Sequence, residues 1–115
     1  MPNRQRLYQV AERIKEIIAT ELVEIADPRF YLVTLTGVKL SSDMRQAKIY
    51  WSTLSKENQK AEIDLAFAGA EGVFKTALAK KLKARFVPNV KFFYDDTFET
   101  QAMVEKLLER IKTNN

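Results

Sequence analysis

The sequence predicts a single α+β domain in the order helix, strand, strand, helix, kink, helix, strand, with a further helix at the C-terminus. Its 115 residues are enough for one hydrophobic core and too few for two domains of ordinary size. Hydrophobic residues make up 46% of the chain and charged residues 30%, as is typical of a folded protein. Apolar residues recur with helical spacing in some stretches and alternate in others. We therefore expect one domain over residues 1–115, with a core over about 4–97 and a C-terminal helix over about 98–112.

A first helix is predicted over residues 5–25. Its apolar side chains recur at intervals of three and four residues, which places them on one face of a helix. They are Leu7, Val10, Ala11, Ile14, Ile17, Ile18, Leu22 and Ile25. The pair Asp27-Pro28 is expected to end this helix, because the residue before a proline is pushed out of the helical conformation.

Two strands joined by a turn are predicted next. Residues 31–40, YLVTLTGVKL, are rich in β-branched side chains, and their apolar positions change from odd to even numbers after Gly37. One extra residue in a strand re-aims the side chains that follow it, so this change indicates a bulge at Gly37. Residues 41–45 are typical of a turn, and residues 46–54 are expected to form the second strand of a hairpin.

The second predicted strand has different side chains on its two faces. Ala47, Ile49 and Trp51 lie on one face, whereas Lys48 and Tyr50 lie on the other. Tyr50 and Trp51 could each stack on a base, as aromatic residues do in some proteins that bind single strands. For Trp51, packing in the core is the simpler interpretation.

A long helical pattern with two internal glycines follows. Its apolar positions are Ile63, Ala66, Phe67, Ala70, Val73, Phe74, Ala77, Leu78 and Leu82. A glycine inside a helix costs about 1 kcal/mol relative to alanine, so Gly69 and Gly72 together suggest a kink with the same face buried on both sides. The basic residues between positions 75 and 85 are then expected on the second helical segment.

The C-terminal part is predicted as a strand and a last helix. Residues 90–94 regain strand character after Pro88, and Asp96 with Glu99 resembles a pair of helix-capping residues. The last helix is expected to bury a stripe of apolar side chains. That stripe consists of Met103, Val104, Leu107, Leu108 and Ile111.

The positive charge of the chain is concentrated in one segment. The formal net charge is +4, from 19 basic and 15 acidic residues. Residues 72–94 contain six of the basic residues and none of the acidic ones. A localised basic patch is typical of proteins that bind phosphates, because neutralising a phosphate releases condensed counterions. A lysine-rich helix face that serves only solubility is the alternative interpretation.

The absence of cysteine and histidine narrows the possible chemistry. It excludes disulfides, the common zinc sites, and Ser-His-Asp and Cys-His catalysis. We therefore expect no enzyme, no cofactor, no metal site and no catalytic residue. A nuclease that holds Mg²⁺ with Asp95 and Asp96 is the enzymatic alternative. No stretch is apolar enough for a signal peptide or a membrane span, so a cytoplasmic protein is expected.

Residues 69–72, Gly-Ala-Glu-Gly, match the GxxG motif of KH domains, in which the loop between two helices holds a nucleic-acid backbone. Four residues alone are a weak signal. The match gains weight because it lies between two predicted helices in the element order of a type II KH fold. Glu71, however, would bring a negative charge close to a phosphate.

Three long stretches carry a wider resemblance. They are VAERIKEIIATEL, VTLTGVKLSSDMRQAKIYWS and AGAEGVFKTALAKKLKARFVPNVKFFYDD. The most specific signals are Asp27-Pro28-Arg29, Thr36-Gly37-Val38, Ser42-Asp43, Ala47-Lys48, Pro88 and Phe93-Tyr94-Asp95. With these residues the chain resembles the bacterial ribosome-binding factor A family from about residue 4 to residue 108. In that KH-like family an Ala-x-Gly kink between helices replaces the GxxG loop, which implies an interhelical kink at Ala70, Glu71 and Gly72.

This resemblance implies an assembly factor that binds the immature small (30S) ribosomal subunit. Its partners would be the 16S rRNA and neighbouring ribosomal proteins, and its role would be late maturation, processing of the 5′ end of that RNA and growth in the cold. A monomer is the default expectation for the free protein. The alternatives are a general nucleic-acid-binding KH-like module without ribosome specificity and a small DNA-binding protein, although no DNA-binding motif is recognisable.

The residues expected to bind RNA follow from the basic segment. Gly72 is expected to let the helix bend so that the basic side chains after it face RNA phosphates, which position a protein without reading sequence. These residues are Lys75, Lys80, Lys81, Lys83 and Arg85, with Arg4, Arg6, Arg29 and Arg45 as second-rank candidates.

Overall fold

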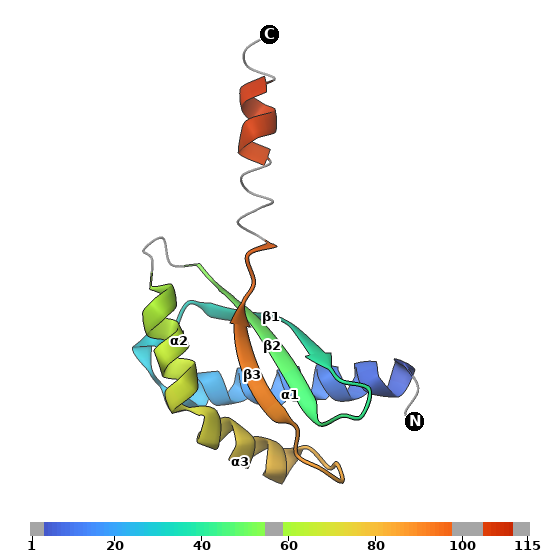
Figure 1. Ribbon diagram of the computed structural model, residues 1–115. Helices are drawn as coiled ribbons and strands as arrows, with labels where there is room; N and C mark the ends of the chain where they lie inside the picture. The colour runs from blue at the N-terminus through green and yellow to red at the C-terminus, as the bar shows by residue number, and fades with distance from the viewer. Residues whose placement is uncertain (1–3, 55–58, 98–104, 112–115) are drawn as a thin grey trace.

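The computed structural model describes residues 4–54, 59–97 and 105–111. Three helices cover one face of a three-stranded sheet (Figure 1). The elements are α1 (Arg4–Ile25), the 3-10 turn η1 (Pro28–Phe30), β1 (Val33–Leu40), β2 (Gln46–Thr53), α2 (Lys60–Gly69), α3 (Glu71–Lys81) and β3 (Asn89–Tyr94). The α+β class and the predicted order of elements are confirmed.

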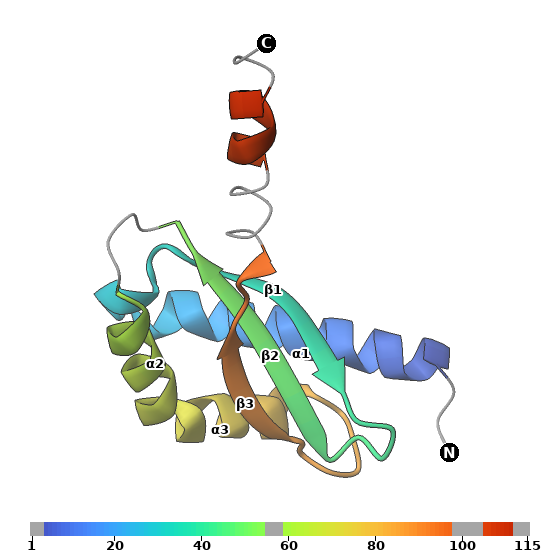
Figure 2. The ribbon, with the colours of Figure 1, turned by 45° about the horizontal axis from the view of Figure 1, so that its top comes forward.

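Strand β2 lies at the centre of the sheet. It pairs antiparallel with β1 through a short turn and parallel with β3. A parallel pair needs a long crossover connection, and α2 with α3 supplies it. Figure 2 shows that the turn between β1 and β2 and the loop between α3 and β3 consequently lie side by side at one end of the sheet.

The predicted bulge in β1 is present, but the extra residue is Thr36. Leu35 lies opposite Trp51 and Gly37 lies opposite Tyr50, which leaves Thr36 without a partner in the register. The bulge turns the side chain of Thr36 away from the helices. Its hydroxyl donates a hydrogen bond of 2.6 Å to Oδ2 of Asp95, just beyond the end of β3.

Helix α1 ends at Ile25, as predicted from the residues that follow it. Ala26 has a left-handed backbone with φ 56°, which leaves the helical conformation. Asp27 then caps η1, because its Oδ1 accepts a hydrogen bond of 2.9 Å from the backbone N–H of Arg29.

The core lies between the sheet and the helices, and Phe67 of α2 is at its centre. The ring of Phe67 lies 4.8 Å from that of Phe30 and 4.3 Å from that of Phe92. Trp51 of β2 lies 5.5 Å from Phe67 and has no exposed surface, so its interpretation as a core residue is confirmed. Aromatic side chains bury large areas, and this cluster therefore joins α2 to the sheet.

The break between α2 and α3 lies at Ala70. This residue has φ −101° and ψ 4°, and its N–H group donates to the carbonyl oxygens of Ala66 and Phe67. Gly72 lies two residues further on, in the first turn of α3, without a left-handed backbone. A Cβ on Gly72 would meet no described atom within 4 Å. Neither the backbone angle nor the space at Gly72 therefore demands a glycine, and its role in the bend stays a prediction.

Helix α3 is shorter than the sequence pattern predicts. It ends at Lys81, and Leu82 at its C-cap is extended, with ψ 102°. The basic residues Lys83 and Arg85 therefore lie in the loop before β3 rather than on the helix. Val73, expected in the core, is 47% exposed because it faces the groove between α3 and α1.

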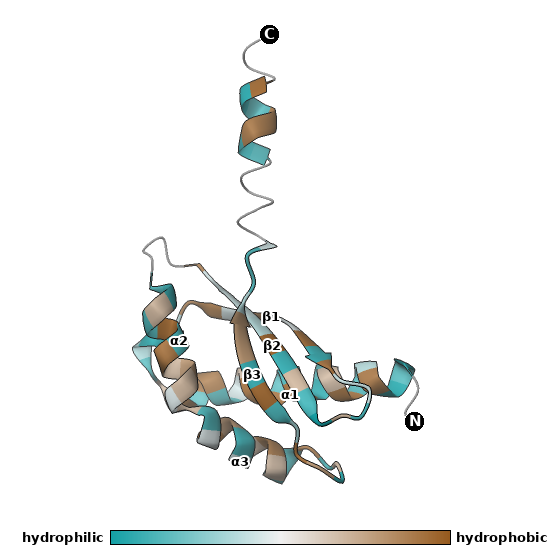
Figure 3. Cartoon of the chain, viewed as in Figure 1, coloured by the Kyte–Doolittle hydropathy of each residue, from teal (hydrophilic) through white to brown (hydrophobic). Residues whose placement is uncertain are grey.

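The segment 105–111 is helical and stands apart from the sheet and the three helices (Figure 1). It contains both hydrophilic and hydrophobic residues (Figure 3). Leu107, Leu108 and Ile111 are 57%, 54% and 62% exposed, so the predicted burial of this stripe is wrong for these three residues. No described part of the chain packs against them. Met103 and Val104 lie outside the described residues.

Candidate nucleic-acid interface

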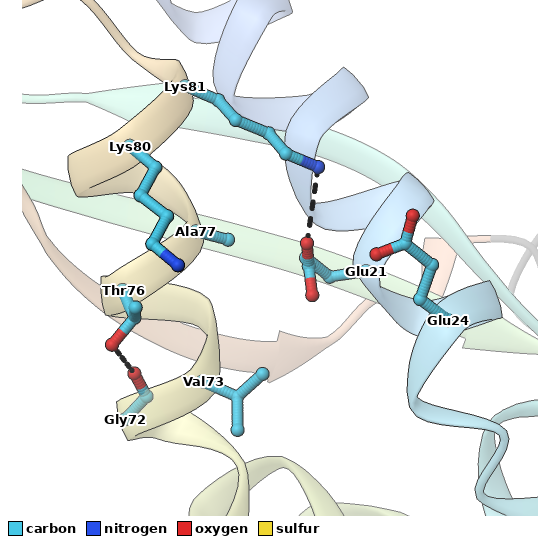
Figure 4. Close-up of a pocket in the computed structure, with 8 residues that line it drawn as sticks. All are labelled: Glu21, Glu24, Gly72, Val73, Thr76, Ala77, Lys80 and Lys81. Atoms are coloured by element: carbon cyan, nitrogen blue, oxygen red, sulfur yellow. Dashed lines mark hydrogen bonds and ion pairs between the residues drawn. The ribbon is translucent and has the colours of Figure 1, made fainter.

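Two of the predicted lysines border a cleft between α1 and α3 (Figure 4). The cleft has a volume of about 520 Å³. It is lined by Glu21, Glu24, Gly72, Val73, Thr76, Ala77, Lys80 and Lys81. The lysines come from α3 and the two glutamates from α1, so the cleft carries both signs of charge.

Lys81 is paired with an acidic side chain of α1. Its Nζ lies 3.3 Å from Oε1 of Glu21, a side chain that is only 12% exposed. Figure 4 shows Lys81 reaching across the cleft to α1, whereas Lys80 runs along α3 towards Thr76. Among the predicted phosphate contacts on α3, Lys75 and Lys80 are therefore better placed for an external anion than Lys81.

A second group of predicted residues meets at the end of the sheet. Arg45 lies in the turn between β1 and β2, and Lys83 and Arg85 lie in the loop between α3 and β3. The guanidinium carbons of Arg45 and Arg85 lie 5.3 Å and 5.5 Å from the centre of the Phe86 ring. Phe86 is 51% exposed, so the site is open to solvent. We call Arg45, Lys83, Arg85 and Phe86 the tip cluster.

Arg45 is held in place by its backbone and by Asp43. The carbonyl oxygen of Arg45 accepts a hydrogen bond of 2.8 Å from the N–H of Asn89, which ties the turn to β3. Oδ1 of Asp43 accepts from the hydroxyl of Ser41 at 2.6 Å and from the N–H of Arg45 at 3.0 Å. The Ser41 hydrogen bond, followed by that of Arg45, lowers the pKa of Asp43. The turn therefore presents Arg45 on a fixed backbone.

The remaining arginines divide between the two ends of α1. Arg4 and Arg6 begin this helix, at the end of the molecule where the turn between β1 and β2 also lies (Figure 1). Arg29 lies in η1 at the opposite end, where its Nη2 is 2.7 Å from Oδ2 of Asp27. The Arg29 side chain lowers the pKa of Asp27 by hydrogen bonding, and Asp27 raises the pKa of Arg29. The structure thus separates Arg29 from the tip cluster.

The kink itself carries mixed charge. Oε1 of Glu71 lies 3.7 Å from Nζ of Lys91, and both side chains are exposed. An exposed ion pair contributes little to stability, yet it leaves a carboxylate where a GxxG loop would approach a phosphate. Ala70 is buried and Gly72 lines the cleft between α1 and α3.

Sequence reasoning missed the aromatic member of the tip cluster and the basic residues of the sheet. Phe86 contacts Arg45 and Arg85, which come from separate segments. Its position next to Arg85 is the only feature of the sequence that could have pointed to it as a member of the cluster. Lys39 and Lys48 occupy polar positions of the two strands, which by themselves predict only solvent exposure.

The described residues provide neither a metal site nor a membrane span. They contain no group of three or more metal-ligating side chains and no helix long and apolar enough to cross a bilayer. Asp95, part of the nuclease alternative, instead accepts hydrogen bonds from the hydroxyl of Thr36 and from the N–H of Thr97. These bonds, that of Thr36 above all, lower the pKa of Asp95.

Comparisons with known proteins agree with this fold. Residues 6–108 match the family model described as Ribosome-binding factor A. The ribosome-binding factor A of Desulfatibacillum aliphaticivorans is 38% identical over 92% of this chain and 87% of its own length. The crystal structure of the Thermus thermophilus ribosome-binding factor A is similar with a TM-score of 0.69 at 26% identity, covering 76% of this chain and 94% of that one.

A second similar structure was placed in a complex with a partner. It is a homology model of the Thermus thermophilus ribosome binding factor A, fitted into an electron cryomicroscopy map of a 30S complex. The TM-score is 0.64 at 26% identity, with 77% of this chain and 94% of that chain covered.

Proposed function

The chain belongs to the ribosome-binding factor A family, and we propose that it binds the small ribosomal subunit and its 16S rRNA through the tip cluster and the exposed lysines of α3. The observation that carries this proposal is the meeting of Arg45 and Arg85 on Phe86. Two arginines from separate segments form a cationic site there, and Lys83 lies in the same loop as Arg85. The 30S complex of a similar protein identifies the class of partner.

The tip cluster suits a folded RNA better than a free nucleotide. A guanidinium can donate two parallel hydrogen bonds to one phosphate, and an exposed ring that contacts both guanidiniums helps to orient them. Such contacts position a protein on RNA without reading its sequence. Recognition of the subunit would then come from the shape of its RNA and from neighbouring ribosomal proteins.

The role that follows from this binding is assembly of the subunit. We propose that the protein, as a monomer in the cytoplasm, joins the immature 30S subunit late in its maturation and aids processing of the 5′ end of the 16S rRNA. This role requires no catalytic residue in the factor itself, because holding one RNA conformation is sufficient to change access of separate enzymes to the RNA.

The test is co-sedimentation with purified small subunits over a salt series from about 50 to 200 mM. If five basic residues each contact one phosphate, the slope of log affinity against log salt should be roughly −4 to −5. These residues are Arg45, Lys75, Lys80, Lys83 and Arg85. The double variant Arg45→Gln with Arg85→Gln should flatten this slope by about 2. The matched control is Arg13→Gln with Lys15→Gln, which removes the same charge from α1.

The competitors decide between the proposed function and its alternative. Binding that large subunits and duplex DNA do not compete supports a factor for the small subunit. Equal competition by either one would indicate a general nucleic-acid-binding module instead. An unchanged slope in the arginine variant, or an equal change in the control, would remove the tip cluster from the interface.

A further inference from the structure

The face of the sheet that the helices leave open carries a row of three lysines. Lys39 of β1 lies directly opposite Lys48 of β2, and Lys48 lies directly opposite Lys91 of β3. All three residues are exposed. Figures 1 and 2 show this face of the sheet turned to the viewer, with α1 behind it and none of the described helices in front.

This arrangement has a cost that the fold offsets only in part. Like charges placed directly opposite each other on neighbouring strands destabilise a sheet. Lys91 has an exposed partner, Glu71, at 3.7 Å, and Lys39 lies 5.9 Å from the ring of Tyr50. Lys48, in the middle of the row, has no acidic partner among the described residues. A row that is unfavourable in the free protein is suited to a partner with negative charge.

The next outward-facing row is aromatic. Tyr50 of β2 lies opposite Phe93 of β3, with ring centres 5.9 Å apart and the planes at 34°. Phe93 is 42% exposed. In β1 the same row holds Gly37, which has no side chain, and Tyr50 is partly exposed. The lysine row and the aromatic row are two residues apart along each strand, which is about 7 Å.

The carboxylate of Asp95, on this face, makes hydrogen bonds within the protein. Asp95 lies beyond the aromatic row, and its oxygens accept from Thr36 and Thr97. At the other end of the face, Gln46 and Asn89 form a neutral row between the lysines and the tip cluster. Along the described open face, the aromatic row is therefore followed by the lysine row and then by the neutral row. The cationic tip cluster lies beyond the neutral row.

We propose that this open sheet face binds an unpaired RNA strand. Two bases stack on Tyr50 and Phe93, and the adjoining phosphates lie along Lys39, Lys48 and Lys91. Stacking on aromatic side chains combined with a cationic path for the backbone is the general mode of single-strand binding, and a sheet face with exposed rings is one established platform for it. The choice of RNA rather than DNA rests on the proposed function.

An unpaired strand fits this face better than the other possible occupants do. A double helix offers its phosphates but not the flat faces of its bases, so it would leave the rings unused. A hydrophobic protein surface would have to bury three lysines without a counter-charge. Only a strand with free bases and phosphates complements both rows.

The experiment measures fluorescence anisotropy of a labelled single-stranded RNA of about eight nucleotides with the full chain. The same RNA annealed to its complement is the competitor. The stacking variants are Tyr50→Thr and Phe93→Leu, which keep strand-forming side chains, and the charge variant is Lys48→Gln. The matched controls are Tyr31→Thr, an exposed tyrosine next to η1, and Lys15→Gln on α1.

We expect each stacking variant to weaken binding of the single strand at least about five-fold. Lys48→Gln should reduce the salt slope by about 0.7, the value for one phosphate of a single strand. Neither control should change the affinity by more than about two-fold. Urea unfolding of every variant checks that the fold is retained.

Three results would overturn the proposal. Equal binding of the single strand and the duplex would show that bases are not stacked. An unchanged affinity in both stacking variants would place the strand elsewhere. Loss of subunit binding in those variants without any binding of the oligonucleotide would identify the face as a contact for a ribosomal protein. Binding to small subunits, measured in parallel, reports on the proposed function separately.

Discussion

The two faces of the sheet are made by the same three strands, yet they differ in almost every physical respect. The face towards the helices contains Ile49 and Trp51, which have no exposed surface. The opposite face contains Lys48 and Tyr50 from the same strand, next to exposed Phe93. Successive residues of β2 therefore lie alternately in the apolar core and on a cationic surface that faces water.

This difference separates residues that fold the protein from residues that do not. The ring of Phe67 packs between the sheet and η1, and every neighbour of it gains from burial. On the open face the arrangement of charges opposes folding, and the ring of Phe93 remains 42% exposed. Side chains that lower the stability of the folded protein are candidates for binding a partner. The open face contains several such side chains.

The largest effect should come from a core ring compared with a ring on the open face. Phe67→Ala removes a buried ring and should lower the free energy of unfolding by about 3–5 kcal/mol. Phe93→Ala loses one cross-strand contact and should cost less than about 1 kcal/mol. Urea unfolding at constant pH measures both. Similar losses in the two variants would mean that the open face is part of the core.

The next effect concerns the link across the open face between Thr36 and Asp95. Thr36→Val removes a hydrogen bond to a carboxylate and should cost on the order of 1 kcal/mol at neutral pH. The same variant should also change how the free energy of unfolding depends on pH in acid. Urea unfolding between pH 7 and pH 2 measures both quantities.

The sign follows from the lowered pKa of Asp95 in the folded protein. The unfolded chain binds more protons than the folded one in the interval below the unfolded pKa of about 3.9, so stability rises with pH there. This contribution is fully present above that value and is lost as pH falls through the folded pKa. Thr36→Val should make the decline below about pH 4 shallower, and an identical decline in both proteins would contradict the assignment.

On the helical side, Gly72 tests whether the bend needs a glycine. Its backbone is not left-handed, and a Cβ would meet no described atom within 4 Å. Gly72→Ala should therefore raise the free energy of unfolding by about 0.5–1 kcal/mol through helix propensity. Urea midpoints with an unchanged m value measure this gain. A loss of stability would show that the bend depends on Gly72 after all.

The smallest effect should come from the lysine row. Lys48→Glu places a negative charge between Lys39 and Lys91 and should raise the free energy of unfolding by roughly 0.5 kcal/mol at low salt. The gain should shrink as salt screens the charges. Lys48→Gln, which removes the repulsion without adding attraction, should give a smaller gain. If both variants lower stability, the row is not a cost to the fold.

The sequence by itself determined the elements, because their signals are local. Helical spacing marked α1, alternation marked β2, and the change of apolar positions around Gly37 located the bulge to within one residue of Thr36. The concentration of positive charge in residues 72–94 was equally visible. These features depend on neighbours a few residues apart, which the order of residues contains directly.

Only the tertiary structure decided which charges act together, because that depends on contacts between distant segments. Lys81 pairs with Glu21 across 60 positions. Arg45 and Arg85 converge on one ring because the crossover brings a turn and a loop to the same end of the sheet. The lysine row exists only in the register of three strands, one of which is paired through that crossover. Pairing and register are non-local, and no spacing along the chain specifies them.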